Sequence, residues 1–278
     1  MIKSKKGFTI LELALAMAFL SFLLLAIGTV TIQLIKVYQK GIAIKDATSA
    51  SRELIDEFTH SISSSYYRPP AETDKTGFKY DVYFEKTLGI EFDGDTKKVP
   101  VNGAFCTGKY SYIWNTGYAL NSDRQVSGGD KGEDYYNANV RAIYRYTDEN
   151  GAEQDYNEDG QPFRLLRVRD NSKSVCVEHD QDTNIYQGGT EPTEFLSPSE
   201  SGDLAIYDLT IFKPVYHANT GHTLFSGTFI LGTIHGGVDI MLSGDFCQDK
   251  PVNFTTDFTY CSVNKFNFVA RATGDARL

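Results

Sequence analysis

Residues 3–35 read KSKKGFTILELALAMAFLSFLLLAIGTVTIQLI, a basic leader followed by an apolar run that contains one carboxylate, Glu12. As a helix, the 20 residues from Leu13 to Ile32 span about 30 Å, the thickness of the hydrocarbon core of a bilayer. A secretory signal peptide would have a shorter apolar core followed by a small-residue cleavage site, whereas here no charge follows Glu12 until Lys36. The stretch therefore predicts a membrane-crossing helix with its lysine-rich end on the cytoplasmic side.

Glu12 is the residue that a plain membrane anchor does not explain. An ionised carboxylate at the end of a membrane helix costs about 2–3 kcal/mol unless it finds a partner. The segment GFTILEL (residues 7–13) resembles the processing site of type IV prepilins, where a basic leader ends in glycine and is followed by an aromatic residue and a glutamate. The alternative is a signal anchor in which the glutamate has no such role.

The resemblance implies a processing step and a set of partners. A membrane prepilin peptidase would cut between Gly7 and Phe8 and methylate the new N-terminus, and Glu12 would pair with the N-terminal ammonium of a neighbouring subunit. A buried carboxylate and a buried ammonium are tolerable only together, so the pair would act as a check on assembly. The implied partners are prepilin peptidase, other pilin subunits contacted through the N-terminal helix, the inner-membrane assembly machinery and the membrane itself. The implied location is the bacterial cytoplasmic membrane, single-pass with a cytoplasmic N-terminus, and then the pilus or cell surface.

The helical pattern continues beyond the apolar run. Apolar residues from Ile42 to Ile62 recur mostly at spacings of three and four, and the pattern ends at the serines of residues 61–65, before Pro69-Pro70. The predicted helix, residues 8–63, would be about 80 Å long. We therefore expect an α+β, pilin-like chain with four parts: a leader (1–7), a transmembrane or filament-core helix (8–35), an amphipathic helix (36–65) and an extracytoplasmic β-rich head (66–278).

The head shows the alternating pattern of a mainly antiparallel β domain. The predicted strands are Tyr80–Glu85, Val140–Tyr146, Leu204–Phe212, Leu224–Leu231, Val238–Leu242 and Asn264–Arg271. The predicted turns are Asn102-Gly103, Gly128-Gly129, Asn150-Gly151, Gly188-Gly189 and Gly236-Gly237. The polar segments 121–139 and 179–202 are expected to be surface loops, and Trp114 is expected in the core.

Four cysteines suit an exported domain with two disulfides, for which three pairings exist. Cys247 and Cys261 flank a polar loop of 13 residues, which leaves Cys106 and Cys176 to pair with each other. Pilins often carry a disulfide near the C-terminus, so the resemblance favours the same pairing. A zinc site that includes Cys176 and His179 is the alternative.

The segment DYNEDG (residues 155–160) reproduces the first half of a calcium-binding loop. The second half fails, because the twelfth position is Leu166 where an EF-hand requires a bidentate glutamate. We expect a polar hairpin loop here, between residues 145–146 and 163–164. The alternative is a calcium site formed by Asp155, Asn157 and Asp159, since calcium stabilises loops in some pilins; no other cofactor is expected.

Charge and motif content disfavour two other functions. The chain has 27 basic and 36 acidic residues, a net charge of −9, and loss of the leader lysines leaves 24 basic residues and a net charge of −12. Such an acidic chain repels nucleic acid, although Arg141 and Arg145 on one strand, with Arg167 and Arg169 on a partner strand, would form a basic stripe. The five histidines are scattered, and neither a G-x-S-x-G elbow nor a glycine-rich phosphate loop occurs, so we do not expect an enzyme.

The function predicted from the sequence is structural. The chain would be a subunit of a type IV pilus or related pseudopilus, and its large head is similar to that of minor, tip-proximal components. The alternative is a membrane-anchored surface protein for binding or adhesion that does not polymerise.

Overall fold

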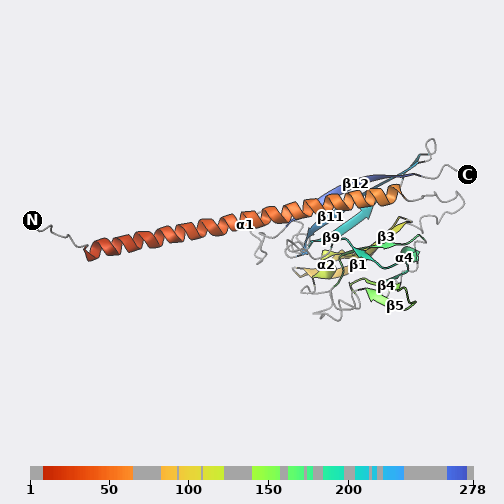
Figure 1. Cartoon of the computed structure of the whole chain (residues 1–278), viewed down its shortest axis with the longest axis horizontal. Helices are drawn as coiled ribbons and strands as arrows, with labels where there is room; N and C mark the ends of the chain where they lie inside the picture. Colours follow the sequence, from red (N-terminus) through yellow and green to blue (C-terminus); the bar gives the residue numbers. More distant parts are fainter. Residues whose placement is uncertain are drawn as a thin grey trace, which may run out of the picture.

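The computed structural model describes residues 9–64, 83–92, 94–107, 109–121, 140–156, 162–171, 174–177, 184–196, 204–212, 215–217, 222–234 and 262–273. Helix α1 (Ile10–Ser63) begins after the N-cap Thr9 and runs without a break through both predicted helical segments. Its 54 residues correspond to about 80 Å. In Figure 1 the N-terminal half of α1 extends away from the head, while the C-terminal half lies against β11 and β12. The predicted continuous helix that ends near residue 63 is confirmed.

The second half of α1 packs on a four-stranded antiparallel sheet. Strand β11 (His222–Thr233) pairs with β12 (Val263–Thr273) along one edge and with β9 (Leu204–Ile211) and β10 (Val215–His217) along the other. The helix residues buried on this side recur at spacings of three and four: Ala43, Ala47, Ser51, Leu54, Phe58, Ser61 and Ile62.

A second sheet covers α1 from another side. Its order is β1 (Tyr83–Phe92), β2 (Asp95–Cys106), β3 (Tyr110–Asn115), β6 (Leu165–Arg169) and β8 (Thr193–Glu194), with all neighbours antiparallel. Side chains alternate between its two faces. One face contributes Phe105, Tyr112, Trp114 and Leu165 to the core around α1, and the other contributes Ala104, Cys106, Ile113, Leu166 and Val168 to a second core.

A small third sheet closes the second core. It consists of β5 (Glu153–Tyr156), β4 (Ile143–Thr147) and β7 (Ile185–Gln187), and β4 and β7 are parallel whereas the other strand pairs of the described chain are antiparallel. Two short helices, α2 (Gly117–Leu120) and α4 (Ser174–Val177), complete the described elements. The predicted class, an α+β chain with a long N-terminal helix and a mainly antiparallel head, is confirmed.

Phe58 of α1 joins the two larger sheets. Its ring centroid lies 5.9 Å from that of Phe105 and 5.0 Å from that of Tyr112 in the five-stranded sheet. It lies 6.2 Å from the centroid of Phe229 and 5.5 Å from that of Phe268 in the four-stranded sheet. The helix therefore supplies the centre of the head's core, and the head and the second half of α1 form one folded unit.

The structure corrects part of the predicted head. Five predicted strands overlap β1, β4, β9, β11 and β12, while Val238–Leu242 lies outside the described residues. The predicted turn at Asn102-Gly103 is wrong, because both residues lie inside β2. The buried Asn102 amide donates to the carbonyl of Val140 at 2.8 Å and accepts from the Tyr186 hydroxyl at 2.8 Å, so tertiary contacts override the local turn preference.

The other predicted turns and loops have mixed outcomes. Gly151, between β4 and β5, has φ +82°, and Gly188 and Gly189, after β7, have φ +103° and +82°, so these two turns are confirmed. Gly128-Gly129 and Gly236-Gly237 lie outside the described residues. The predicted loop 179–202 contains the short strands β7 and β8, and is wrong to that extent.

A disulfide joins Cys106, at the end of β2, to Cys176 in α4, with 6.3 Å between the Cα atoms. This is the pairing expected from the sequence for these two cysteines. The zinc alternative is wrong, because the sulfur of Cys176 is bonded to that of Cys106. Cys247 and Cys261 lie outside the described residues.

Candidate functional site

The N-terminal half of α1 is the largest exposed apolar surface of the described chain. Every residue from 9 to 38 is exposed, and the large apolar ones point to all sides of the helix rather than to one face. A helix that is apolar all round is typical of a membrane span or of a bundle with other helices. This helix is long and apolar enough to cross a membrane.

Glu12 lies in the first turn of this helix and is held by its own chain. Its Oε2 accepts hydrogen bonds from the backbone N–H of Thr9 at 2.9 Å and from the Thr9 hydroxyl at 3.0 Å. The Glu12 N–H in turn donates to the Thr9 hydroxyl oxygen at 3.3 Å. The two residues form a reciprocal capping box, which satisfies N–H groups that a helix start leaves free. The carboxylate therefore fixes the start of α1 within a single copy of the chain.

Other predicted site residues are only partly placed. Gly7 and Phe8, the residues of the predicted processing site, lie outside the described residues, as do Asn157 and Asp159 of the calcium alternative. Asp155 is described and lies in β5, directly opposite Arg145 of β4, and not in a loop. Its two carboxylate oxygens accept from Arg145 Nε at 2.6 Å and Nη2 at 2.9 Å. This bidentate pair lowers the pKa of Asp155, chiefly through the hydrogen bonds from Arg145.

The arginines do not form the predicted basic stripe. Strand β6, which carries Arg167 and Arg169, pairs with β3 and β8 and not with β4. Arg141 is buried and donates from Nε to the carbonyl of Ala119 at 3.1 Å. Arg145 pairs with Asp155 and Arg167 pairs with Glu57, so these arginines lie on different sheets with different partners.

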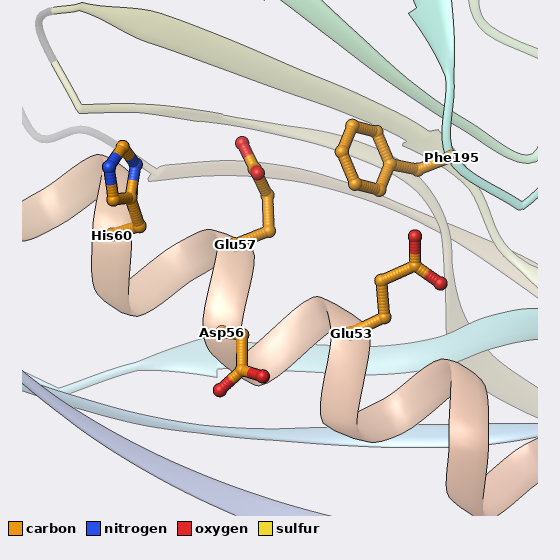
Figure 2. Close-up of a pocket in the computed structure, with 5 residues that line it drawn as sticks. All are labelled: Glu53, Asp56, Glu57, His60 and Phe195. Carbon is orange, nitrogen blue, oxygen red and sulfur yellow. The ribbon is translucent and has the colours of Figure 1, made fainter.

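A shallow hollow beside the second half of α1, here called the acidic groove, is lined by Glu53, Asp56, Glu57, His60 and Phe195. Figure 2 shows Glu53, Glu57 and His60 on the side of the helix that faces Phe195, while Asp56 points away from it. The side chains of Glu53 and Asp56 are exposed. The described wall thus offers carboxylates, one imidazole and one aromatic ring.

Glu57 links α1 to the five-stranded sheet at the base of this groove. Its Oε1 accepts from the Tyr112 hydroxyl at 2.7 Å and from Arg167 Nη1 at 3.2 Å. The Arg167 guanidinium also lies over the rings of Tyr110 and Phe195, at 5.1 and 4.9 Å from their centroids. Burial raises the pKa of Tyr112, so its hydroxyl stays protonated and able to donate to the Glu57 carboxylate.

Among its described lining residues, the groove has no nucleophilic side chain of the kind that a hydrolytic site uses beside a histidine. No serine, threonine or cysteine lines it beside His60. Among the residues that the structure describes, no group of three or more histidine, cysteine, aspartate or glutamate side chains is arranged to hold a metal ion. The described wall of the groove therefore carries mainly carboxylate side chains.

Two residues of these sites were not predicted from the sequence. Thr9 lies in the GFTILEL segment, and T-x-x-E before an apolar run is the sequence pattern of a capping box, which is the local signal for its role. Glu57 lies within the predicted amphipathic helix, and no local pattern indicates that Tyr112 and Arg167, far along the chain, would meet it.

The fold and the exposed helix together define a class of protein: an α+β head carried on a helix able to anchor it in a membrane. Comparisons with protein families, with curated proteins and with solved structures find no match for this chain.

Proposed function

We propose that this chain is a structural subunit of a type IV pilus or related pseudopilus, in a minor or tip-proximal position, and that it assembles through the first half of α1. One observation carries the proposal. A fully exposed helix half, apolar on all sides and headed by Glu12, continues directly into the helix half on which the head is folded. Such a helix needs either lipid or other helices around it. A pilus subunit meets both, because its helix lies in the membrane before assembly and among the helices of the filament core afterwards.

The processing step gives the first test. The chain would be expressed with a bacterial prepilin peptidase, recovered from cell envelopes, and analysed by intact mass and N-terminal sequencing. The proposal expects a chain that begins at methylated Phe8. A chain that keeps residues 1–7, or one that is cut beyond the apolar segment, would refute it.

The capping box makes the role of Glu12 testable in a sharper way. Glutamine also serves as the acceptor of a capping box, so Glu12→Gln keeps the hydrogen bonds to Thr9 but removes the charge. If Glu12 pairs with the ammonium of a neighbour, both Glu12→Gln and Glu12→Ala lose incorporation into filaments. If the carboxylate only caps the helix, Glu12→Gln behaves like the unchanged chain.

One observation favours a second function, a membrane-anchored binding protein that does not polymerise. Glu12 already has hydrogen-bond partners in its own chain, so it does not require a neighbouring subunit to satisfy it. Under this alternative the leader is retained and the acidic groove is the binding surface. The N-terminal sequence separates the two functions in one measurement.

A further inference from the structure

The apolar half of α1 ends in a short cationic segment. Its charged residues are Lys36, Lys40 and Lys45, and the sequence has no acidic residue between Glu12 and Asp46. In the described part of the chain, none of these three lysines has an ion-pair or hydrogen-bond partner. The chain as a whole has a net charge of −9, so three cations without an acid between them are a local exception that calls for an anionic partner.

The segment lies at the depth of a lipid headgroup layer. Each such layer is roughly 5–8 Å deep beyond the hydrocarbon core. On the helix axis, Lys36 lies about 2 Å and Lys40 about 8 Å beyond Ile35, the last residue of the apolar run. Tyr38, which is 71% exposed, lies between the two lysines, and tyrosine is typical of the membrane interface. Ala43, the first helix residue buried by the head, lies only about 12 Å beyond Ile35.

Two of the lysines share the face of α1 that packs on the head. Spacings of four, three and four place Lys36, Lys40, Ala43 and Ala47 in one row along the helix. The row continues through the buried Phe58, so it changes from apolar to cationic where the helix leaves the head. Lys36 is exposed and Lys40 is half-buried. Figure 1 shows the head on the second half of α1 only, so this pair lies between the head and the membrane span.

We infer that Lys36 and Lys40 bind the headgroup of an anionic lipid in the layer between the head and the hydrocarbon core. A lipid phosphate lies at this depth, and lysine binds phosphate as a compact point charge while its stem stays along apolar surface. Because α1 runs unbroken into the head, a lipid held here also fixes the height of the head above the bilayer. The inference rests on the membrane span alone, so it holds for a pilus subunit before assembly and for an anchored binding protein.

The test measures which lipid lies beside the helix at this depth. The full-length chain with Ile32→Trp is reconstituted in vesicles of phosphatidylglycerol and phosphatidylcholine, with brominated acyl chains on one lipid or on the other. Ile32 is 57% exposed and lies one turn before Lys36 on the same face, and bromine quenches tryptophan fluorescence only at close contact. Trp114 is 1% exposed in the core of the head, so its signal is a constant background.

We expect the anionic lipid to be preferred at this site by at least about fivefold, the factor for one lysine near an anionic surface. Lys36→Gln with Lys40→Gln should bring the preference close to one, whereas Lys36→Arg with Lys40→Arg should keep it. High salt should weaken the preference of the unchanged chain.

The matched control, Arg52→Gln with Lys109→Gln, removes the same charge farther from the membrane. Arg52 lies about 25 Å beyond Ile35 on α1. Lys109 lies two residues after Thr107, whose hydroxyl is 2.8 Å from that of Ser61 near the end of α1. This control should keep the lipid preference of the unchanged chain.

Three results would overturn the inference. Equal quenching by the two brominated lipids in the unchanged chain would show that no anionic lipid is bound, and equal loss in the control would show that net charge governs the preference. A preference that survives Lys36→Gln with Lys40→Gln would assign the lipid contact to other residues. The leader lies at the opposite end of the span, so its retention would refute the proposed function and leave this measurement valid, while failure here leaves the proposed function standing.

Discussion

Replacement of Phe58 by alanine tests whether α1 is the centre of the head's core. The Phe58 ring is fully buried and has four aromatic neighbours within 6.2 Å, two from each of the larger sheets. Truncation of a buried phenylalanine costs about 3–5 kcal/mol, from lost transfer free energy and from the cavity that remains. Neighbours from both sheets cannot close on the gap together, so we expect the upper part of this range. The loss is a large share of the roughly 5–15 kcal/mol that stabilises a typical domain.

The assay is urea unfolding of the full chain in detergent, followed by tryptophan fluorescence. Trp114 is the only tryptophan of the chain, is 1% exposed and belongs to the same core cluster as Phe58. With a slope of roughly 2–3 kcal/mol per molar urea, the midpoint should fall by more than about 1 M. Phe212→Ala is the matched control: the side chain is 48% exposed on the outer face of a sheet, and its loss should cost under about 1 kcal/mol. Equal effects of the two changes would refute the placement of α1 between the sheets.

Three further predictions concern single contacts of the head. Glu57→Gln weakens the link to Tyr112 and Arg167 and should cost about 1–2 kcal/mol in the same unfolding assay, whereas Glu53→Gln, on the exposed rim of the groove, should cost almost nothing. Replacement of Cys106 and Cys176 by alanine opens a link across 70 residues and should cost about 4 kcal/mol on the chain-entropy estimate; equal unfolding midpoints for the oxidised and reduced unchanged chain would contradict this. The pKa of Asp155 is lowered in the folded chain, so the pair with Arg145 contributes stability above the unfolded pKa near 4 and loses it as the pH falls through the folded value. Asp155→Asn should therefore reduce the pH dependence of the urea unfolding midpoint below about pH 4. A pH dependence equal to that of the unchanged chain would contradict a stabilising Asp155–Arg145 pair.

Elements with a strong local pattern were predicted well from the sequence. The end of α1 was predicted because serines and the Pro69-Pro70 pair interrupt a clear period of three to four. Strands β9, β11 and β12 were predicted because each has eight or more residues rich in β-branched and aromatic side chains; β12 alternates buried and exposed side chains, whereas the first four residues of β9 are all buried.

Elements whose pattern is set by distant contacts were not predicted. Strand β2 contains Pro100 and Asn102-Gly103, all of which indicate a break when considered locally. The structure accommodates Pro100 at a register shift opposite Lys86 and Thr87, and it accommodates the Asn102 amide through Val140 and Tyr186. Strands β7 and β8 have three and two residues, too few to show any period.

The candidate sites follow the same division. The T-x-x-E pattern at Thr9 and Glu12 is local, and sequence alone could have given its capping geometry. The base of the acidic groove is not local, because Glu57 meets a tyrosine 55 residues away and an arginine 110 residues away. Which side chains share the outer face of the four-stranded sheet depends on the order of its strands, which composition and periodicity do not determine.

The two halves of α1 place opposite demands on one helix. From residue 9 to 38 it is exposed on every side, whereas from Ala43 to Ile62 it supplies the core of the head. No flexible linker separates the halves, so the orientation of the head is fixed by the orientation of the exposed half. A surface protein that only needs tethering gains nothing from such a rigid connection, because a flexible linker would let the head reach its ligand. A subunit that must place its head in register with its neighbours does gain from it, and this rigidity is the strongest structural argument for preferring assembly over simple anchoring.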